Sequence, residues 1–446
     1  MAQDSPKYEI FKIISADGKN EVDFAKAQFR VGNIYYYENI LSPFITGVVT
    51  ISSTSKAAKS PSSVDVQNRF ASLHSGLPLE VGCQILMKIK NSIGSGINFS
   101  STTNDHKRFY VNEVQVLSKS SKSEIIQLRF ISKIGWSNNT KRITRHFAGS
   151  ITESIKSILK KELKLKNDMI SVDDSSNSYS FAGMTKRPFD LIVMLAKQTI
   201  PKNTANPGYF AYETKTGFKY LSVDSLVNKK PYKKNYFYSS IIKGSQQSRS
   251  NKDNFKIASL TVVKDQNLTS QIRSGVYGNK TIFFNPATYG FTEIDITVDN
   301  DKLFKDPKFS TLGKKPGVPK ILEDDFGSGN KFHRVQTAVL NIGGNEENIN
   351  PNNNPEFYYA AGTTRYNLLF SQQHAITIPG NTDLEAGDVL RLDIENIGDA
   401  KEEGPDQKQS GNYIIQGLCH YFDPEASTTS LLLVRDSYGL HSSKNS

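Results

Sequence analysis

The feature that most constrains how this chain of 446 residues can fold is a pattern that occurs twice. Leu79 begins the run Leu-Glu-Val-Gly-Cys-Gln-Ile-Leu-Met-Lys-Ile, and Leu384 begins the run Leu-Glu-Ala-Gly-Asp-Val-Leu-Arg-Leu-Asp-Ile. In each copy a Leu-Glu-x-Gly turn precedes an alternating strand. A hairpin led by tyrosine follows, with Tyr110 coming 31 residues after Leu79 and Tyr413 coming 29 residues after Leu384. Two matches in the same order predict two copies of one small, tube-like antiparallel β-barrel.

Glycines mark the turns of this pattern. Gly82 and Gly387 hold the same place in the two copies, and we expect both to adopt positive φ, which glycine does at little cost. A plain flexible turn is the alternative. Upstream, Pro43 precedes a β-branched run that contains Gly47, and we expect Pro43 and Gly47 to shape a bend or bulge between strands. An ordinary loop is the alternative for this pair.

The composition favours a mainly β fold with α+β insertions. Hydrophobic residues make up 37% of the chain and aromatic residues 10%, so the chain can bury sizeable cores, and its length favours several domains. Residues 125–132 alternate in the way of a half-buried strand, with Ile126, Leu128 and Phe130 on one face. The preceding Val- and Tyr-rich segment 109–117 and a Ser/Lys turn complete a predicted hairpin.

A helical period interrupts the strands after residue 139. Ser150 and Glu153 stand at capping-box spacing, and apolar residues then repeat every three or four positions. A second helix is predicted where Pro188 opens an apolar stretch, with Phe189 and Leu195 in its core. We therefore expect a small α/β module between the two barrels.

These patterns predict four regions along the chain. Two of them are the sibling barrels, one is the α/β module with two helices, and one is an insertion with long loops, rich in Lys, Asp, Gly and Pro around 299–330 and in Asn around 343–355. The expected boundaries are 1–138 for the first barrel, 139–207 for the module, 208–262 and 357–440 for the second barrel, and 263–356 for the insertion.

No residue pattern indicates catalysis, a cofactor or a metal. The seven histidines are scattered, with no pair at the i, i+4 spacing of a helical metal site, and the sequence contains neither Cys-x-x-Cys nor a phosphate-binding glycine loop. Paired carboxylates such as Asp173 and Asp174 lie in polar segments without a sign of the apolar pocket that acid catalysis needs. The two cysteines, Cys83 and Cys419, are expected to be reduced and structural.

The net charge of +11 raises nucleic acid as a partner, but the basic residues are dispersed and solvated faces explain them. No apolar run is long enough to span a membrane, so membrane insertion is not expected. The first residues lack the apolar core of a secretory signal, and we expect the chain to be made and folded in a cytoplasm.

Four passages resemble the baseplate hub proteins of T-even-like contractile-tailed phages, and more distantly phage-tail protein D and the hub portions of VgrG proteins. They occur in the family's order over most of the chain, while residues 264–331 and 343–355 have no match. The passages are residues 37–47, residues 187–190 with the helix that follows, residues 208–226, and residues 376–437.

The resemblance implies a structural virion protein of the tail baseplate rather than an enzyme. The family forms homotrimeric rings with two tube-like domains per subunit, so that three chains present six similar units. Such a ring connects the hexameric tail tube, or its initiator proteins, to the trimeric cell-puncturing spike. It also contacts other baseplate proteins and leaves an axial channel for the tape-measure protein and for DNA in transit.

Two functions of other classes remain as alternatives. A tail-associated cell-wall hydrolase would need paired carboxylates or a Cys/His pair in a cleft. A basic nucleic-acid-binding virion protein would show salt-sensitive DNA binding.

Overall fold

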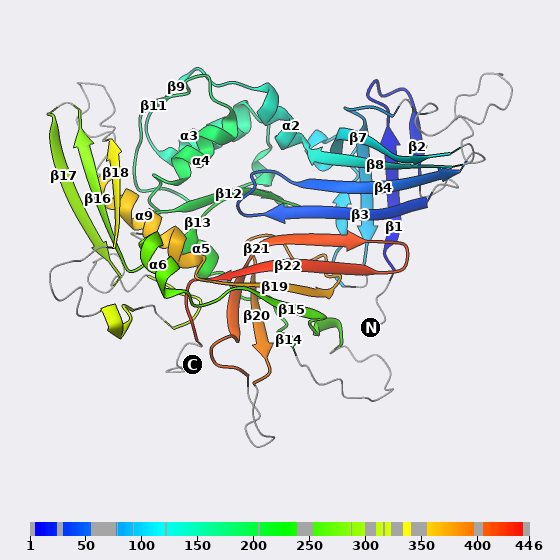
Figure 1. Ribbon diagram of the computed structural model, residues 1–446. Coiled ribbons are helices and arrows are strands. Elements are labelled where there is room, and N and C mark those ends of the chain that lie inside the picture. The colour runs from blue at the N-terminus through cyan, green and yellow to red at the C-terminus, as the bar shows by residue number, and fades with distance from the viewer. Residues whose placement is uncertain are drawn as a thin grey trace.

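The computed structural model contains a large β-sheet, an α/β module and a small peripheral sheet (Figure 1). Most of the two long-loop segments expected around 299–330 and 343–355 lies outside the described residues. The structure describes residues 5–24, 30–54, 77, 79–91, 93–120, 123–203, 206–238, 253–286, 288–298, 309–314, 317–322, 333–339, 355–396 and 405–439.

The large sheet has 14 strands drawn from both ends of the chain. They are β1 (Lys7–Ile14), β2 (Glu21–Asp23), β3 (Arg30–Asn39), β4 (Thr46–Thr54), β5 (Gln84–Lys90), β6 (Ile97–Phe99), β7 (Phe109–Lys119), β8 (Ser123–Ser132), β14 (Tyr236–Tyr238), β15 (Ser259–Lys264), β19 (Gln372–Pro379), β20 (Val389–Ile394), β21 (Gly411–Phe422) and β22 (Ser427–Arg435).

The path through this sheet runs β15-β19-β22-β21-β3-β4-β8-β7-β5-β1-β2, with β20 and β14 branching from β21 and β6 branching from β5. The two halves of the chain meet where β3 pairs antiparallel with β21. They share one hydrophobic core, in which Ile34 and Phe130 of the first half and Leu418 and Leu433 of the second half are all buried.

The mainly β class is confirmed, but strand pairing does not close either half into a barrel within the described residues. The hydrogen-bonded path ends at β2 on one side and at β15 on the other, and the halves are joined edge to edge. The physical reason lies at β3, whose second edge is taken by β21 instead of returning to its own half.

The two halves pair their strands in the same order. The first half contains the series β5-β7-β8-β4-β3, and the second contains the series β20-β21-β22-β19-β15. The register is interrupted at the same point of the hairpin in each half, between Val111 and Glu113 in β7 and between Ile415 and Gly417 in β21. The duplication seen in the sequence is therefore also a duplication of strand pairing.

The sequence alignment of the two hairpins is wrong by one residue. Ile85 lies opposite Phe109, whereas its counterpart Leu390 lies opposite Tyr413. Phe109, and not Tyr110, therefore corresponds to Tyr413. A shift of one residue moves a side chain to the other face of a strand, and both Phe109 and Tyr413 are fully buried.

The α/β module extends further than its expected boundary at residue 207. Tyr209 and Phe218 lie in strands that pair with a strand of the module and not with the large sheet. The sequence favoured the second barrel for these strands because they directly precede other segments of that barrel in the chain. The module contains α2 (Lys133–Thr140), β9 (His146–Phe147), α3 (Ile151–Lys161), β10 (Ile170–Val172), β11 (Phe181–Ala182), α4 (Pro188–Ala196), β12 (Tyr209–Thr214), β13 (Gly217–Ser222) and α5 (Val223–Val227).

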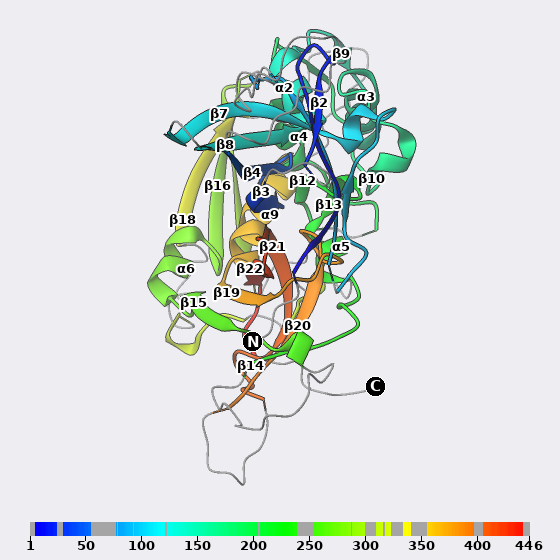
Figure 2. The same ribbon diagram turned by 90° about the vertical axis from the view of Figure 1, so that its right-hand side faces the viewer.

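Helix α3 begins after Ser150, but the expected capping box does not form. The Ser150 hydroxyl lies 3.1 Å from the Ser175 hydroxyl and makes no capping bond to the helix. The apolar side chains of α3 and α4 share one buried core with the three-stranded sheet β10-β13-β12. In Figure 2 the two helices lie above β10 and β12.

The expected insertion contains a three-stranded sheet of order β17-β16-β18, which packs against a helix that the sequence did not indicate. This sheet stands apart from the large one (Figure 1). No helix among the described residues is both long and apolar enough to span a bilayer. The elements are α6 (Leu268–Ser274), β16 (Gly278–Asn285), β17 (Gly290–Thr297), β18 (Arg334–Val339) and α9 (Pro355–Leu369), with one-turn 3₁₀ helices at Asp105–Lys107, Asn167–Met169, Asp253–Phe255 and Lys320–Leu322.

Candidate assembly surface and the polar junction behind it

Pro43 and Gly47 occupy different structures. Pro43 lies in the connection between β3 and β4. Gly47 does not form the expected bend or bulge between strands, because it lies within β4 and pairs with Tyr36 and Phe130. Gly47 is needed for space. A Cβ atom there would lie 2.2 Å from Cζ of Phe130 and 2.5 Å from the carbonyl oxygen of Tyr35.

Gly82 and Gly387 have the same backbone conformation. Their φ angles are 89° and 81°. The Gly82 N–H donates to the Val111 carbonyl at 2.8 Å, and the Gly387 N–H donates to the Ile415 carbonyl at the same distance. In both copies the turn therefore connects the strand that follows it to the hairpin through the same backbone hydrogen bond.

The side chain that follows each glycine also has the same role. The Glu80 N–H donates to Sγ of Cys83 at 3.4 Å, and the Glu385 N–H donates to Oδ2 of Asp388 at 2.9 Å. Cys83 is thus a turn residue in the first copy, and its side chain is buried and not part of a disulfide. The two copies thus use a sulfur atom and a carboxylate oxygen as the acceptor of the same backbone N–H in the turn.

Helix α4 is held in the module core by its first residues. Pro188 occupies its first turn, where the missing N–H leaves no bond unmade. Phe189 packs between Phe44 and Phe218, with ring centroids 6.1 and 5.8 Å away. Leu195 is fully buried in the same core.

The part of one sheet face that is formed by β3, β4, β19, β21 and β22 is nearly free of charge, and the exposed Arg129 of β8 and Glu113 of β7 border it. Between residues 31 and 39 of β3, and throughout β4, β19, β21 and β22, the only acidic or basic side chains besides histidine are Glu38 and Arg435. Both are buried on the opposite side. This contrasts with a chain that is 22% charged overall.

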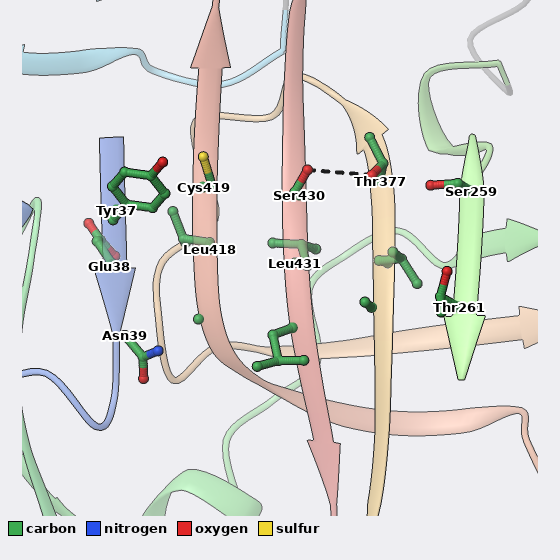
Figure 3. A pocket seen from close by; sticks show the side chains of 14 residues that line it. Tyr37, Glu38, Asn39, Ser259, Thr261, Thr377, Leu418, Cys419, Ser430 and Leu431 are labelled. Carbon is green, nitrogen blue, oxygen red and sulfur yellow. Dashed lines mark hydrogen bonds between the residues drawn. The ribbon is translucent and has the colours of Figure 1, made fainter. Parts of the chain in front are cut away.

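Small polar side chains cover this face in rows that cross the strands in register. In one row, Tyr37 pairs with Cys419, which is followed by Ser430, Thr377 and Ser259. These residues line a shallow hollow of about 450 Å³, in which Thr377 and Ser430 form a hydrogen bond of 3.4 Å (Figure 3). The face is smooth and hydroxyl-rich, and we treat it as the candidate assembly surface.

Three buried carboxylates lie behind this surface, at the junction of both halves with the module. Glu38 of β3 accepts the Tyr36 hydroxyl and the Lys215 N–H at 2.7 Å, and the Ala386 N–H at 2.9 Å. Burial, together with the nearby charge of Glu385, raises the pKa of Glu38 to about 7. One side chain thus binds the first half to the module and to the repeated turn of the second half.

Glu213 of β12 connects the module to the first half. Its Oε2 atom accepts the Ile45 N–H at 3.0 Å and the Ser132 hydroxyl. Burial raises the pKa of Glu213 to about 7. The junction on this side is therefore built around a carboxyl group that is neutral in mildly acidic solution.

Glu385 connects the module to the second half by charge. It pairs with the Lys219 ammonium group and accepts the hydroxyls of Thr214 and Thr216 at 3.0 and 2.9 Å. Burial alone would raise its pKa, but Lys219 and these hydrogen bonds hold the pKa below its usual value. The module therefore binds one half through a neutral acid and the other through an ion pair.

A second buried ionic cluster binds α9 to the rest of the molecule. Arg365 is fully buried and pairs with Asp224 of α5 at 2.9 Å and with Asp436, just after β22, at 3.0 Å. Its guanidinium group also lies over the ring of Phe309, 4.7 Å from the centroid. These contacts connect the module, the second half and the region around the small sheet.

This geometry supports a positioning role for the buried carboxylates rather than chemistry on a substrate. Each accepts hydrogen bonds from protein groups, and burial keeps solvent away. Among the described residues, no three His, Cys, Asp or Glu side chains gather as metal ligands do. His374 of β19 and His420 of β21 are both buried, and burial lowers their pKa values to about 4 and about 3.

Comparisons with known proteins agree with this architecture. No protein-family model matches the chain. Over 304 residues it is 22% identical to the "Probable baseplate hub protein gp334" of Vibrio phage KVP40, covering 65% of this chain and 66% of that protein. The match thus spans just under two thirds of the relative's length, and it confirms the resemblance to phage hub proteins.

Two solved structures have similar folds over almost their whole length. One is the 43 kDa tail protein of prophage MuSo2 from Shewanella oneidensis, with a TM-score of 0.52, 12% identity, and coverage of 96% of this chain and 98% of that chain. The other is a tail protein from Neisseria meningitidis MC58, with a TM-score of 0.53, 11% identity, and coverage of 97% and 98%. The chain has a phage tail-protein fold. At such low identity the likeness concerns the fold alone.

Proposed function

We propose that the chain is a structural subunit of the baseplate hub of a contractile phage tail. It acts as a homotrimer located in the virion, assembled in the host cytoplasm, and has no catalytic role. Its partners are the tail tube or tube-initiator proteins on one side, the trimeric spike on the other, and neighbouring baseplate proteins. The relative in phage KVP40 supports the location, since it is named as a hub protein.

The observation that carries this proposal is the equivalent strand pairing of the two halves, side by side in one sheet. Because each subunit contributes two similar units, three subunits around one axis present six similar units. A homotrimer of this kind can meet a six-fold ring on one face and a three-fold object on the other.

The charge-poor sheet face suits the wall of an axial channel. A passing nucleic acid carries one phosphate for each nucleotide, and lysine or arginine side chains along the wall would hold it electrostatically. Hydroxyl and small apolar side chains, such as Thr377, Ser430 and Leu432, offer no such charge. The tape-measure protein and then DNA could pass this face without being retained.

The assembly state tests the proposal directly. Light scattering coupled to size exclusion, at micromolar protein concentration, is expected to give the mass of three chains, and negative-stain images are expected to show rings with a central hole. A strict monomer, both alone and with the spike protein, contradicts the hub assignment.

The channel assignment has its own test. We expect virions carrying Thr377→Lys together with Ser430→Lys to assemble but to eject DNA more slowly. The matched control is Thr144→Lys on the exposed surface of the module. Equal ejection rates for the double variant and the control would contradict the proposal that this face lines the channel.

A further inference from the structure

A second hollow lies where the first half, the module and the second half meet. It has a volume of about 410 Å³ and is open to solvent on one side. Its wall is made of hydroxyls, an amide, backbone and two lysines, with no acidic side chain. The lining residues are Ser95, Gly96, Asn98, Ser100, Ser101, Lys107, Lys215 and Thr216.

Each lysine of this pocket is anchored by a backbone carbonyl. Nζ of Lys107 donates to the carbonyl of Lys215 at 2.6 Å, and Nζ of Lys215 donates to the carbonyl of Thr382. The Lys107 ammonium group also lies 5.3 Å from the centroid of the Phe99 ring. Both side chains are thus fixed at the pocket instead of extending freely into solvent.

Within the part of the chain that the structure describes, neither lysine has an acidic partner within hydrogen-bonding reach. Among the described residues, the ion pairs of this region are Lys219 with Glu385 and Arg108 with Asp105, and neither includes Lys107 or Lys215. An ammonium group has three N–H donors, and each lysine uses one of them on a carbonyl oxygen. Unused donors therefore remain on both cations.

Burial increases the need for a counter-ion. Lys107 is partly buried, and desolvation lowers its pKa. The carboxylates nearest to it in electrostatic effect are Glu213, Glu385, Asp168 and Glu38. Glu385 is already paired with Lys219, and Glu38 and Glu213 have pKa values of about 7, so at neutral pH they are only partly ionised. Asp168 acts on Lys107 only at longer range, since the two form no ion pair among the described residues. Partly desolvated cations without full compensation favour an added anion.

The wall offers further donors to such an anion. The side-chain oxygen Oδ1 of Asn98 accepts a hydrogen bond from the Ser100 hydroxyl at 2.7 Å, so the side-chain N–H groups of Asn98 can serve as donors to an anion. We propose that this pocket binds an oxyanion between Lys107 and Lys215. The ligand class comprises phosphate and sulfate, and equally the carboxylate of an acidic side chain that a neighbouring protein inserts.

Titration of the full-length protein tests this proposal. Inorganic phosphate or sulfate, added at constant ionic strength against chloride, is expected to raise the melting temperature in a saturable way. Lys107→Met and Lys215→Met are each expected to weaken that binding at least tenfold. The matched control is Lys166→Met, an exposed lysine of the module outside the pocket, which should bind as the wild type does.

A parallel titration with a short oligo-aspartate peptide distinguishes the two sources of the oxyanion. Saturable binding of phosphate or sulfate that depends on both lysines supports a free anion. Binding of the peptide alone, with the same dependence, supports an acidic side chain from a partner. Absence of saturable binding of all three probes to the wild-type protein overturns the proposal, and this result does not depend on whether any variant folds.

Discussion

The two copies of the Leu-Glu-x-Gly turn have the same backbone but very different surroundings. Glu80 and Val81 of the first copy are exposed, whereas Glu385 and Ala386 of the second are buried under the module. Each copy nevertheless keeps its positive-φ glycine and the same N–H bond to the hairpin. The difference teaches that a duplicated sequence can preserve a local conformation while the tertiary neighbours of each copy decide what a substitution costs.

The same lesson holds inside the core that the two halves of the large sheet share. Strand pairing places Gly47 of the first half opposite Phe130, and His374 of the second half opposite Leu433. A small residue faces a large ring in one half, and an aromatic residue faces a smaller aliphatic one in the other. The two halves therefore fill the same position of the strand pairing with different residue types.

The largest expected effect concerns the end of the last strand of each half. After β22 of the second half comes Asp436, which pairs with the fully buried Arg365. At the end of β8 of the first half the chain passes from Ser132 into α2 without such an ion pair. We expect Arg365→Ala to lower the free energy of unfolding by about 3–5 kcal/mol, because the buried carboxylates of Asp224 and Asp436 lose their cationic partner. Urea denaturation measures this change.

The control for this prediction is a pair at the surface. Arg129 lies 3.5 Å from Glu113, and both side chains are at least half exposed. Arg129→Ala should change the free energy of unfolding by less than about 1 kcal/mol. Equal effects of the two substitutions would mean that Arg365 does not anchor the second half.

The glycines of the two turns give the next largest effect. A Cβ atom on Gly387 would lie 2.1 Å from Oη of Tyr212, whereas on Gly82 it would meet only Cβ of Ala16 at 3.7 Å. Gly82→Ala should cost about 1 kcal/mol from backbone strain alone, and Gly387→Ala about 3 kcal/mol because overlap is added to strain. Thermal and urea unfolding of both variants would show the difference, and similar costs would contradict the unequal packing.

The junction should respond to pH with opposite signs on its two sides. Burial raises the pKa of Glu213 from 4.5 to about 7, so the native state binds the extra proton. The stabilising contribution is complete below the unfolded value and is lost as pH rises through about 7. The stability of Glu213→Gln relative to wild type should therefore increase between pH 5 and pH 8, by up to about 3 kcal/mol.

Glu385 should behave in the opposite way. Its pKa is lowered in the native state, so its contribution is complete above the unfolded value and is lost as pH falls through the native pKa. The deficit of Glu385→Gln relative to wild type should be largest above pH 5 and should shrink in acid. Chemical denaturation over a pH series checks both variants, and slopes of the same sign would contradict the assignment of a neutral acid and an ion pair.

The smallest expected effect is at the exposed counterpart of Glu385. Glu80→Gln should change the free energy of unfolding by no more than about 0.5 kcal/mol at any pH in the same series, because Glu80 is exposed to solvent. A larger, pH-dependent effect would show that the first turn is also covered, for instance by another subunit.

Much of the fold could be predicted from short-range patterns. The alternation in 125–132 corresponds to β8, the helical periods after Ser150 and Pro188 correspond to α3 and α4, and the repeat corresponds to equivalent strand pairing. Helix α9 was missed because its apolar residues do not form a clear stripe. The capping box failed because Ser175, distant in sequence, competes for the Ser150 hydroxyl.

The candidate site was less accessible to sequence reasoning. Glu38 follows Ile34 and Tyr36 at the spacing of one strand face, which is a signal that an acid points inward. Glu385 carried the weaker signal of lying in the repeated turn. Neither pattern shows which donors would meet these carboxylates, because Lys215, Lys219 and Ala386 come from other parts of the chain.

The sequence by itself thus determined the local conformations, namely the alternating strands, the amphipathic helices and the duplicated turn with its glycine, because these depend on neighbours a few residues apart. The tertiary structure alone decided that β3 joins β21 in one continuous sheet, that β12 and β13 belong to the module, and that three acids are buried where the parts meet. The physical reason is that burial and charge compensation depend on which surfaces come into contact, and those contacts join residues far apart in the chain.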